Sequence, residues 1–212
     1  LTKSNPNAAQ TIQASEKIQI QEGEEIELEN QNIFGIYEPA SYDLNLNMWS
    51  TTKADDLRSS LKRLNKIELS KSSNEILESI LFSFSYPPKG MSDKEFVDLK
   101  INWLIKNNRT NLIENFLKQN DQFDSKSRAV QYLVDKNIAG GNIKEGCEKI
   151  KFIDAKIKDA YLEKFKIYCL VFNDKKPEAQ LLLDLLREQK QSSKFYDDKI
   201  NFLLGYTVKT SK

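Results

Sequence analysis

The feature that most constrains the fold is a turn-forming pair of residues that recurs at a fixed interval. The pairs Asn107-Asn108, Gly140-Gly141 and Asn173-Asp174 lie 33 residues apart. Asn and Gly accept the left-handed backbone that ends many helices. Each pair separates a longer helical pattern from a shorter one. The spacing therefore predicts antiparallel helix pairs, repeated along the chain, in an all-α protein.

The repeat length is typical of one class of helical array. A helix-turn-helix unit of about 34 residues is the tetratricopeptide (TPR) layout, in which each unit leaves an apolar face that its neighbour covers. The first inward positions of the second helices keep the 33-residue step: Ile113, Gly146 and Ala179. Trp103, Lys136 and Cys169 also share one register position, but they have no chemistry in common. We predict helix pairs stacked as a short TPR-like α-solenoid; the alternative is an irregular α-bundle with coincidental turn spacing.

Apolar residues at helical spacing extend the helical prediction to residues 55–205. Leu57, Leu61 and Leu64, for example, occupy positions i, i+4 and i+7 of one helix face. The 33-residue period holds between about residues 93 and 190. The helices before and after that range are expected to cap the ends of the array.

Short polar residues mark where two helices begin. Ser92 stands three residues before Glu95, which is the capping-box arrangement at a helix N-terminus. We expect Ser72 or Ser73 to open the preceding helix, because serine side chains accept hydrogen bonds from the first amides of a helix. Both starts lie just before apolar residues at helical spacing.

Residues 1–45 differ from the rest of the chain in composition. They are rich in Asn, Gln, Glu and Ser, a composition that favours an extended or disordered polar arm. The stretches Ile18-Gln-Ile20 and Ile26-Glu-Leu28 alternate as short strands do and could pair as a hairpin, which is the alternative. We therefore divide the chain into an arm, residues 1–45, and an α-helical repeat domain, residues 46–212.

An apolar cluster between residues 33 and 49 stands out against this polar background. It is too apolar to stay in water, so we expect it to lie over the helical body or to insert into a partner. Phe34, Tyr37 and Trp49 are the candidate residues for contact with another protein chain.

The charge balance argues against nucleic acid as a partner. Lys and Arg number 32, Asp and Glu number 31, and the net charge is +1. Few basic residues are arginines, which form the bidentate contacts typical of nucleic-acid binding; they are Arg58, Arg63, Arg109, Arg128 and Arg187. A field this balanced also exerts no general attraction toward anionic lipid.

No stretch of the sequence approaches the ~18 to 20 apolar residues that cross a bilayer, so we expect no transmembrane segment. The chain opens at Leu1 rather than at Met. A cloned fragment and a cleaved signal peptide are the two interpretations of that start.

The two cysteines, Cys147 and Cys169, are expected on consecutive antiparallel helices. With the connecting turn at residues 154–156, the two positions would be offset by roughly 9 Å, which is more than a disulfide tolerates. A turn nearer residues 157–161 would allow a disulfide. A bridged pair and two buried reduced thiols therefore both stay open.

The sequence offers little for catalysis. Histidine is absent, which excludes Ser-His-Asp and Cys-His arrangements and removes the commonest metal ligand. Two cysteines cannot form a four-ligand zinc site. The acidic run 22–29 lacks the spacing of a calcium loop, and carboxylate pairs such as Asp55-Asp56 stand at helix starts, where the dipole explains them. We predict no enzyme, no catalytic or metal-binding residues and no cofactor.

Several short segments carry a family resemblance: Leu46-Asn-Met-Trp49-Ser50, Ser85-Tyr-Pro-Pro88, and Tyr168–Asp174 continuing through Ala179 to Leu182–Glu188. Together they resemble an uncharacterised group of alphaproteobacterial envelope proteins with TPR-like α-helical repeats. The resemblance spans residues 46–205 and assigns no functional residue. It implies export to the periplasm, with the cytoplasm as the alternative. An oxidising periplasm would favour a disulfide between the two cysteines.

These features predict a non-enzymatic protein-interaction module of the bacterial cell envelope. It would dock another protein, of unknown identity, by its helical surface or its N-terminal arm. The alternative is a helical protein that binds a small molecule or lipid in an apolar cavity. The residues expected to line such a cavity are Phe82, Phe84, Trp103 and Phe116.

Overall fold

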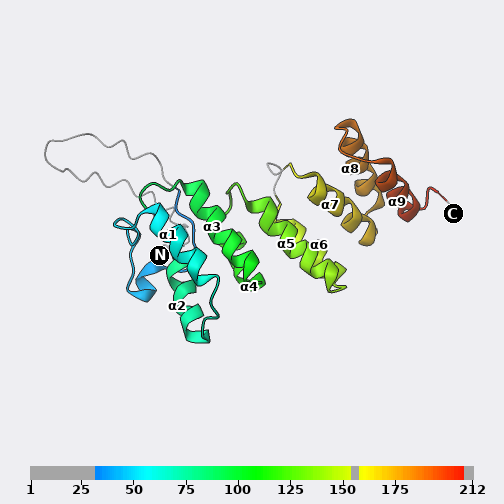
Figure 1. Ribbon diagram of the computed structural model, residues 1–212. Helices are drawn as coiled ribbons and strands as arrows, with labels where there is room; N and C mark the ends of the chain where they lie inside the picture. Colours follow the sequence, from blue (N-terminus) through cyan, green and yellow to red (C-terminus); the bar gives the residue numbers. More distant parts are fainter. Residues whose placement is uncertain (1–31, 154–157, 208–212) are drawn as a thin grey trace, which may run out of the picture. The chain divides into compact units, whose positions relative to one another are not determined.

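The computed structural model describes residues 32–153 and 158–207. Within these ranges the chain forms nine α-helices and two short 3-10 helices, with no strand, which confirms the all-α class (Figure 1). The elements, in chain order, are η1 (Pro39–Tyr42), α1 (Ala54–Leu64), α2 (Lys71–Phe82), α3 (Asp93–Lys106), α4 (Thr110–Gln119), α5 (Lys126–Ala139), α6 (Ile143–Lys149), η2 (Ile150–Phe152), α7 (Ala160–Phe172), α8 (Lys176–Glu188) and α9 (Lys194–Leu204).

Three helix pairs repeat with the predicted spacing. The first helices, α3, α5 and α7, begin 33 and 34 residues apart, and the second helices, α4, α6 and α8, begin 33 residues apart. The two helices of each pair contact each other and lie side by side in Figure 1. Contacts also join α3 to α5, α5 to α7 and α7 to α9.

The same turn is built three times between the paired helices. Asn108, Gly141 and Asp174 all adopt the left-handed backbone, with φ of 53°, 74° and 59°. In each turn the preceding residue donates its backbone N–H to the carbonyl four residues earlier: Asn107 to Trp103, Gly140 to Lys136 and Asn173 to Cys169. The left-handed residue then donates to the carbonyl three residues earlier, as Asn108 does to Ile105, and the residue after it to the carbonyl five residues earlier, as Arg109 does to Leu104. These two bonds form the Schellman pattern of a helix that ends at a left-handed residue. The turn prediction is therefore confirmed in its backbone geometry.

The predicted inward positions of the second helices are buried. Ile113 and Ala179 have no exposed surface, and Gly146 is also buried. A Cβ atom on Gly146 would lie 3.4 Å from Cζ of Phe165 on α7. Close packing at this position thus explains why one member of the series has no side chain.

The N-cap of α3 is the residue predicted from the sequence, and the N-cap of α2 is not. Ser92 Oγ accepts a hydrogen bond from Glu95 N at 3.2 Å, as predicted for α3. The other half of the predicted capping box does not form, because the Glu95 carboxylate binds Arg58. The prediction for α2 was wrong, because its N-cap is Ser70 rather than Ser72 or Ser73. Ser70 has the extended backbone that an N-cap needs, and its Oγ accepts from the amide of Ser73 inside the helix.

An N-terminal strap, which we define as residues 32–37, lies against the helices. Ile36 N donates to Phe82 O at 2.6 Å, and Phe84 N donates to Tyr37 O at 3.0 Å. At Gly35 the approach is so close that a Cβ atom would lie 2.5 Å from Phe84 N. Glycine is therefore required at this point of the strap.

All described residues belong to one compact unit. Phe34, Ile36 and Tyr37 pack against its hydrophobic core, so the packed unit extends to the N-terminal side of the boundary predicted at residue 45. The hairpin segments Ile18-Gln-Ile20 and Ile26-Glu-Leu28, and the acidic run 22–29, lie outside the described residues.

A disulfide joins Cys147 on α6 to Cys169 on α7, with the Cα atoms 5.4 Å apart. The offset expected for a turn at residues 154–156 does not occur. Helix α6 ends at Lys149, and α7 begins only at Ala160. Cys147 thus lies only two residues before the end of its α-helix, so counting a helical rise from Cys147 to residues 154–156 overstates the offset.

Candidate functional site

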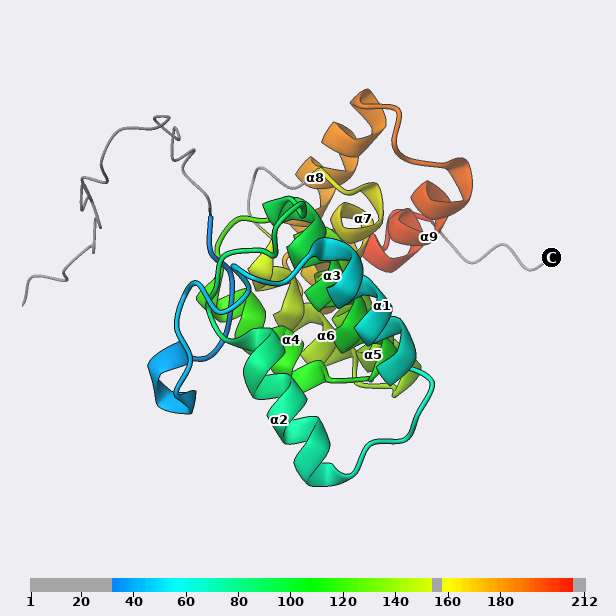
Figure 2. The ribbon, with the colours of Figure 1, turned by 60° about the vertical axis from the view of Figure 1, so that its left-hand side comes forward.

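A groove of about 490 Å³ lies between α1 and α3, two helices that run beside each other in Figures 1 and 2. Its apolar lining is Leu61, Leu99 and Trp103, and the rest is charged or carboxamide side chains. The lining residues are Arg58, Leu61, Lys62, Asn65, Lys66, Glu95, Asp98, Leu99, Asn102, Trp103 and Lys106.

One side of the groove is closed by a charged contact between the two helices. Arg58 on α1 donates to both carboxylate oxygens of Glu95 on α3, from Nε at 2.6 Å and Nη2 at 2.8 Å. Arg58 Nη1 also reaches Asp55 at 2.6 Å. These hydrogen bonds, that to Glu95 foremost, raise the pKa of Arg58 above its ordinary value. The contact is bidentate and fixes α1 against α3.

The remaining cations of the groove have no such partner. Within residues 32–153 and 158–207, Lys62, Lys66 and Lys106 form no ion pair, and the side chains of Asn65 and Asn102 form no hydrogen bond. Lys62 and Lys106 stand in the last turns of α1 and α3, where the helix dipole favours positive charge. Five hydrogen-bonding side chains thus surround the groove without a protein partner.

Two buried polar side chains, unlike the exposed lysines of the groove, hold the strap by hydrogen bonds to its backbone. Lys100 on α3 is fully buried; its Nζ donates to Phe34 O at 2.7 Å and lies 4.2 Å from the centre of the Phe96 ring. Burial lowers the pKa of Lys100 to about 7. Asn120 receives an N–H from Gly35 and donates to the carbonyls of Gly35 and Phe116. Both side chains are occupied by the chain itself, so their role is structural.

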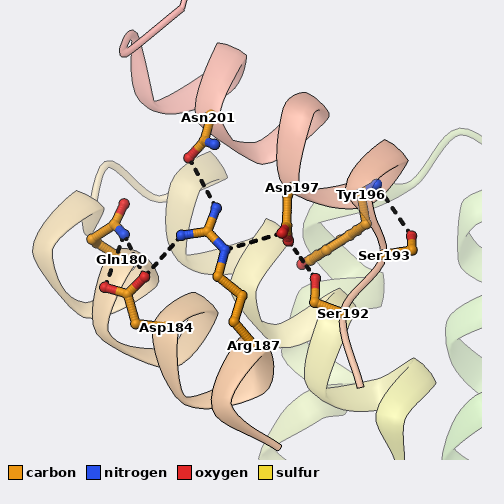
Figure 3. Close-up of polar contacts among 8 residues, drawn as sticks. All are labelled: Gln180, Asp184, Arg187, Ser192, Ser193, Tyr196, Asp197 and Asn201. Atoms are coloured by element: carbon orange, nitrogen blue, oxygen red, sulfur yellow. Dashed lines mark hydrogen bonds and ion pairs between the residues drawn. The ribbon is translucent and has the colours of Figure 1, made fainter. Parts of the chain in front are cut away.

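A second charged cluster joins α8 to α9 (Figure 3). Arg187 lies between three acceptors: Asp184 at 2.9 Å, Asp197 at 3.1 Å and Asn201 at 3.4 Å. Ser192 also contacts Asp197. Because every nitrogen of the Arg187 guanidinium has an acceptor, this cluster holds the last helix in place and offers no unpaired charge to a ligand.

The described residues include side-chain types that can hold a metal ion or act as nucleophiles. Within these described residues, no three side chains among His, Cys, Asp and Glu come together in a way that could hold a metal ion. The two cysteines are engaged in the disulfide. The most perturbed lysine, Lys100, contacts two backbone carbonyls and a ring rather than a cavity.

The three aromatic residues predicted to contact a partner all pack against this chain. Phe34 meets Phe123 edge-on at 6.3 Å, and Tyr37 meets Tyr42 at 5.6 Å. Trp49 packs against Phe96, and its Nε1 donates to Ser85 Oγ at 3.2 Å. The structure therefore shows the first outcome expected of the cluster, packing over the helices. A role in binding another chain stays a prediction.

Three of the four aromatic residues proposed to line an apolar cavity belong to the core, and the fourth, Phe84, is half-buried. Phe82 and Phe116 have no exposed surface, and Trp103 is 4% exposed. The Phe82 and Trp103 rings lie 5.6 Å apart. Of the predicted lining residues, only Trp103 reaches the α1–α3 groove.

Apart from Trp103, the groove residues were not predicted as a site from the sequence. Lys62 and Lys66 stand four positions apart at the end of the α1 pattern, and Asn102 and Lys106 do the same in α3. Residues four apart share a helix face, so the polar stripe on each helix could have been recognised. That the two stripes face each other depends on packing between helices that are not adjacent in sequence.

Comparison of the chain with protein-family models, with curated proteins and with solved structures gives no match. In the part of the chain that the structure describes, no helix has the length and apolar character to cross a bilayer.

Proposed function

We propose that this protein is a non-enzymatic protein-interaction module that docks a partner by its helical surface, at the α1–α3 groove. The observation that carries the proposal is a set of polar groove side chains that have no partner within residues 32–153 and 158–207: Lys62, Asn65, Lys66, Asn102 and Lys106. Two polar groups outside the groove, Arg187 and Asn120, are by contrast held by the chain itself. Groups left without partners at a concave surface can bind a ligand without breaking internal contacts.

The helical repeat supports a TPR-like role. Three pairs share one turn geometry, and the first helices contact one another along the series. Stacked helix pairs of this kind present extended surfaces that bind peptides or other subunits. We therefore place the module among TPR-like α-solenoids.

The disulfide supports a location in the bacterial periplasm, with the cytoplasm as the alternative. Structural disulfides persist in oxidising compartments and are rare in the cytosol. Native protein isolated under thiol trapping is expected to carry no trapping label on Cys147 and Cys169 until a reductant is added. Labelling of both thiols before reduction would contradict a periplasmic location.

The function is tested by capture with matched variants. The wild-type chain, the groove variant Lys62→Glu/Lys106→Glu and the control Lys118→Glu/Lys176→Glu are immobilised and exposed to extract of the source organism. Lys118 and Lys176 are exposed and lie outside the groove. A partner protein should be retained by the wild type and the control and lost from the groove variant. Identical retention by all three, or co-purification of a lipid or metabolite alone, would contradict the proposal.

A further inference from the structure

We infer that the occupant of the α1–α3 groove is an extended, glutamate- or aspartate-rich peptide segment of the partner. This inference rests on the proposed function and specifies the chemistry of the partner. It follows from the charge of the groove, from its carboxamides and from its size.

The charge of the groove favours carboxylates. Of its two acids, Glu95 is bound by Arg58, and Asp98, which forms no ion pair within residues 32–153 and 158–207, is outnumbered by the free lysines. The cations Lys62, Lys66 and Lys106 have no carboxylate partner in the described ranges. An acidic ligand would therefore meet three unpaired ammonium groups and would displace no internal ion pair.

The carboxamides favour a peptide over a simple anion. Asn65 and Asn102 each offer one acceptor and two donor hydrogens. One follows the end of α1 and the other lies in α3, and their side chains form no hydrogen bond within residues 32–153 and 158–207. An extended peptide presents backbone N–H and C=O groups that a carboxamide can bind from both sides. A halide or sulfate ion offers no donor to match the carboxamide oxygens.

The size of the groove suits a short stretch of extended chain. Its volume of about 490 Å³ falls within the ~300 to 1,000 Å³ typical of ligand pockets. Leu99, half-buried between the polar side chains, provides an apolar contact for the stem of a glutamate or for a small neighbouring residue.

The test measures binding of synthetic peptides to the full chain by fluorescence anisotropy at low salt. The probe is fluorescein-labelled (Glu-Ala)4, and (Gln-Ala)4 has the same length without charge. The groove variant is Lys62→Gln/Lys66→Gln/Lys106→Gln. The control, Lys118→Gln/Lys144→Gln/Lys176→Gln, removes the same net charge from exposed sites outside the groove. Thermal unfolding confirms that each variant is folded.

The glutamate peptide is expected to bind the wild type and the control with equal affinity. Its affinity for the groove variant should be lower by a factor of at least about ten. The glutamine peptide should bind the wild type at least about tenfold more weakly than the glutamate peptide. Equal loss in the control would overturn the inference, since net charge alone would then explain binding. Competition by free glutamate as effective as by the peptide would overturn it as well, in favour of a small-anion site.

The two proposals fail in different ways. If neither peptide binds while the groove variant still loses its captured protein partner, the acidic-peptide inference is wrong and the interaction function stands. If the glutamate peptide binds in the groove but no protein is captured there, the chemistry of the site stands and the interaction function fails.

Discussion

Two charged clusters on this protein contain the same kinds of side chain and differ in what those side chains contact. At the α8–α9 end, Arg187 reaches three acceptors on two helices. At the α1–α3 groove, Lys62, Lys66 and Lys106 reach none in the described ranges. The difference separates residues that hold the fold from residues available to a ligand. Substitution of the first group should cost stability, and substitution of the second group should cost binding alone.

The largest difference in the effect of a substitution on stability is expected between two asparagines. Asn120 is buried and makes three hydrogen bonds to Gly35 and Phe116, whereas the exposed Asn102 makes none with its side chain in the described ranges. Asn120→Ala should lower the free energy of unfolding by about 3 kcal/mol, because it leaves buried backbone groups unpaired. Asn102→Ala should change it by less than about 0.5 kcal/mol. Urea unfolding measures both, and equal effects would refute the distinction.

The next largest difference is in how two lysines of α3, Lys100 and Lys106, affect the pH dependence of stability. Burial lowers the pKa of Lys100 to about 7 in the folded protein, against about 10.4 in an unfolded chain. Between these values the unfolded chain binds more protons, so stability rises with pH, and the cost of burying the charge is fully present below pH 7. The groups facing its ammonium are the Phe34 and Ser83 carbonyls and the Phe96 ring.

The measurement is urea unfolding from pH 6 to 9. Relative to the variant Lys100→Met, the wild type should gain stability above pH 7 at up to about 1.4 kcal/mol per pH unit. The control Lys106→Met alters an exposed lysine of the groove and should follow the wild-type pH dependence. Parallel curves for the wild type and Lys100→Met would show that Lys100 titrates as an exposed lysine does.

The smallest difference in stability is expected between a substitution in the half-exposed α8–α9 cluster around Arg187 and one in the groove. Arg187→Gln should lower the free energy of unfolding by about 1 kcal/mol, since its ion pairs with Asp184 and Asp197 are partly solvated. The loss should shrink at 0.5 M salt, where exposed charges are screened. The matched change Lys62→Gln should have almost no effect at either salt concentration. A salt-independent loss for Arg187→Gln would mean that packing, rather than charge, holds α9.

Local sequence signals predicted the repeated part of the fold well. The turns at Asn108, Gly141 and Asp174 follow from residues that tolerate a left-handed backbone, and the Ser92 cap follows from its spacing to Glu95. These features depend on neighbours within one helical turn. The α2 cap was misplaced because Ser70, Ser72 and Ser73 compete locally, and backbone conformation decides among them.

Features that depend on contacts between distant segments were not predicted. The disulfide stayed open in the sequence because the offset between the two cysteines depends on where α6 ends, which the residue pattern did not give. The candidate site was missed because Arg58 and Glu95, which join its two helices, stand 37 residues apart. Lys100 gave a usable signal that was overlooked: it stands four positions after Phe96 on the buried face of α3.

The central claim, that the α1–α3 groove is where this protein binds, is tested most directly by mapping a bound peptide onto the backbone. Isotope-labelled full chain is titrated with (Glu-Ala)4, and the shift of each backbone amide signal is followed by NMR. The largest shifts should cluster at Asn65, Asn102 and their neighbours in α1 and α3, with little change in α8 and α9. Shifts concentrated on α8 and α9, or spread evenly over all exposed lysines, would contradict the claim.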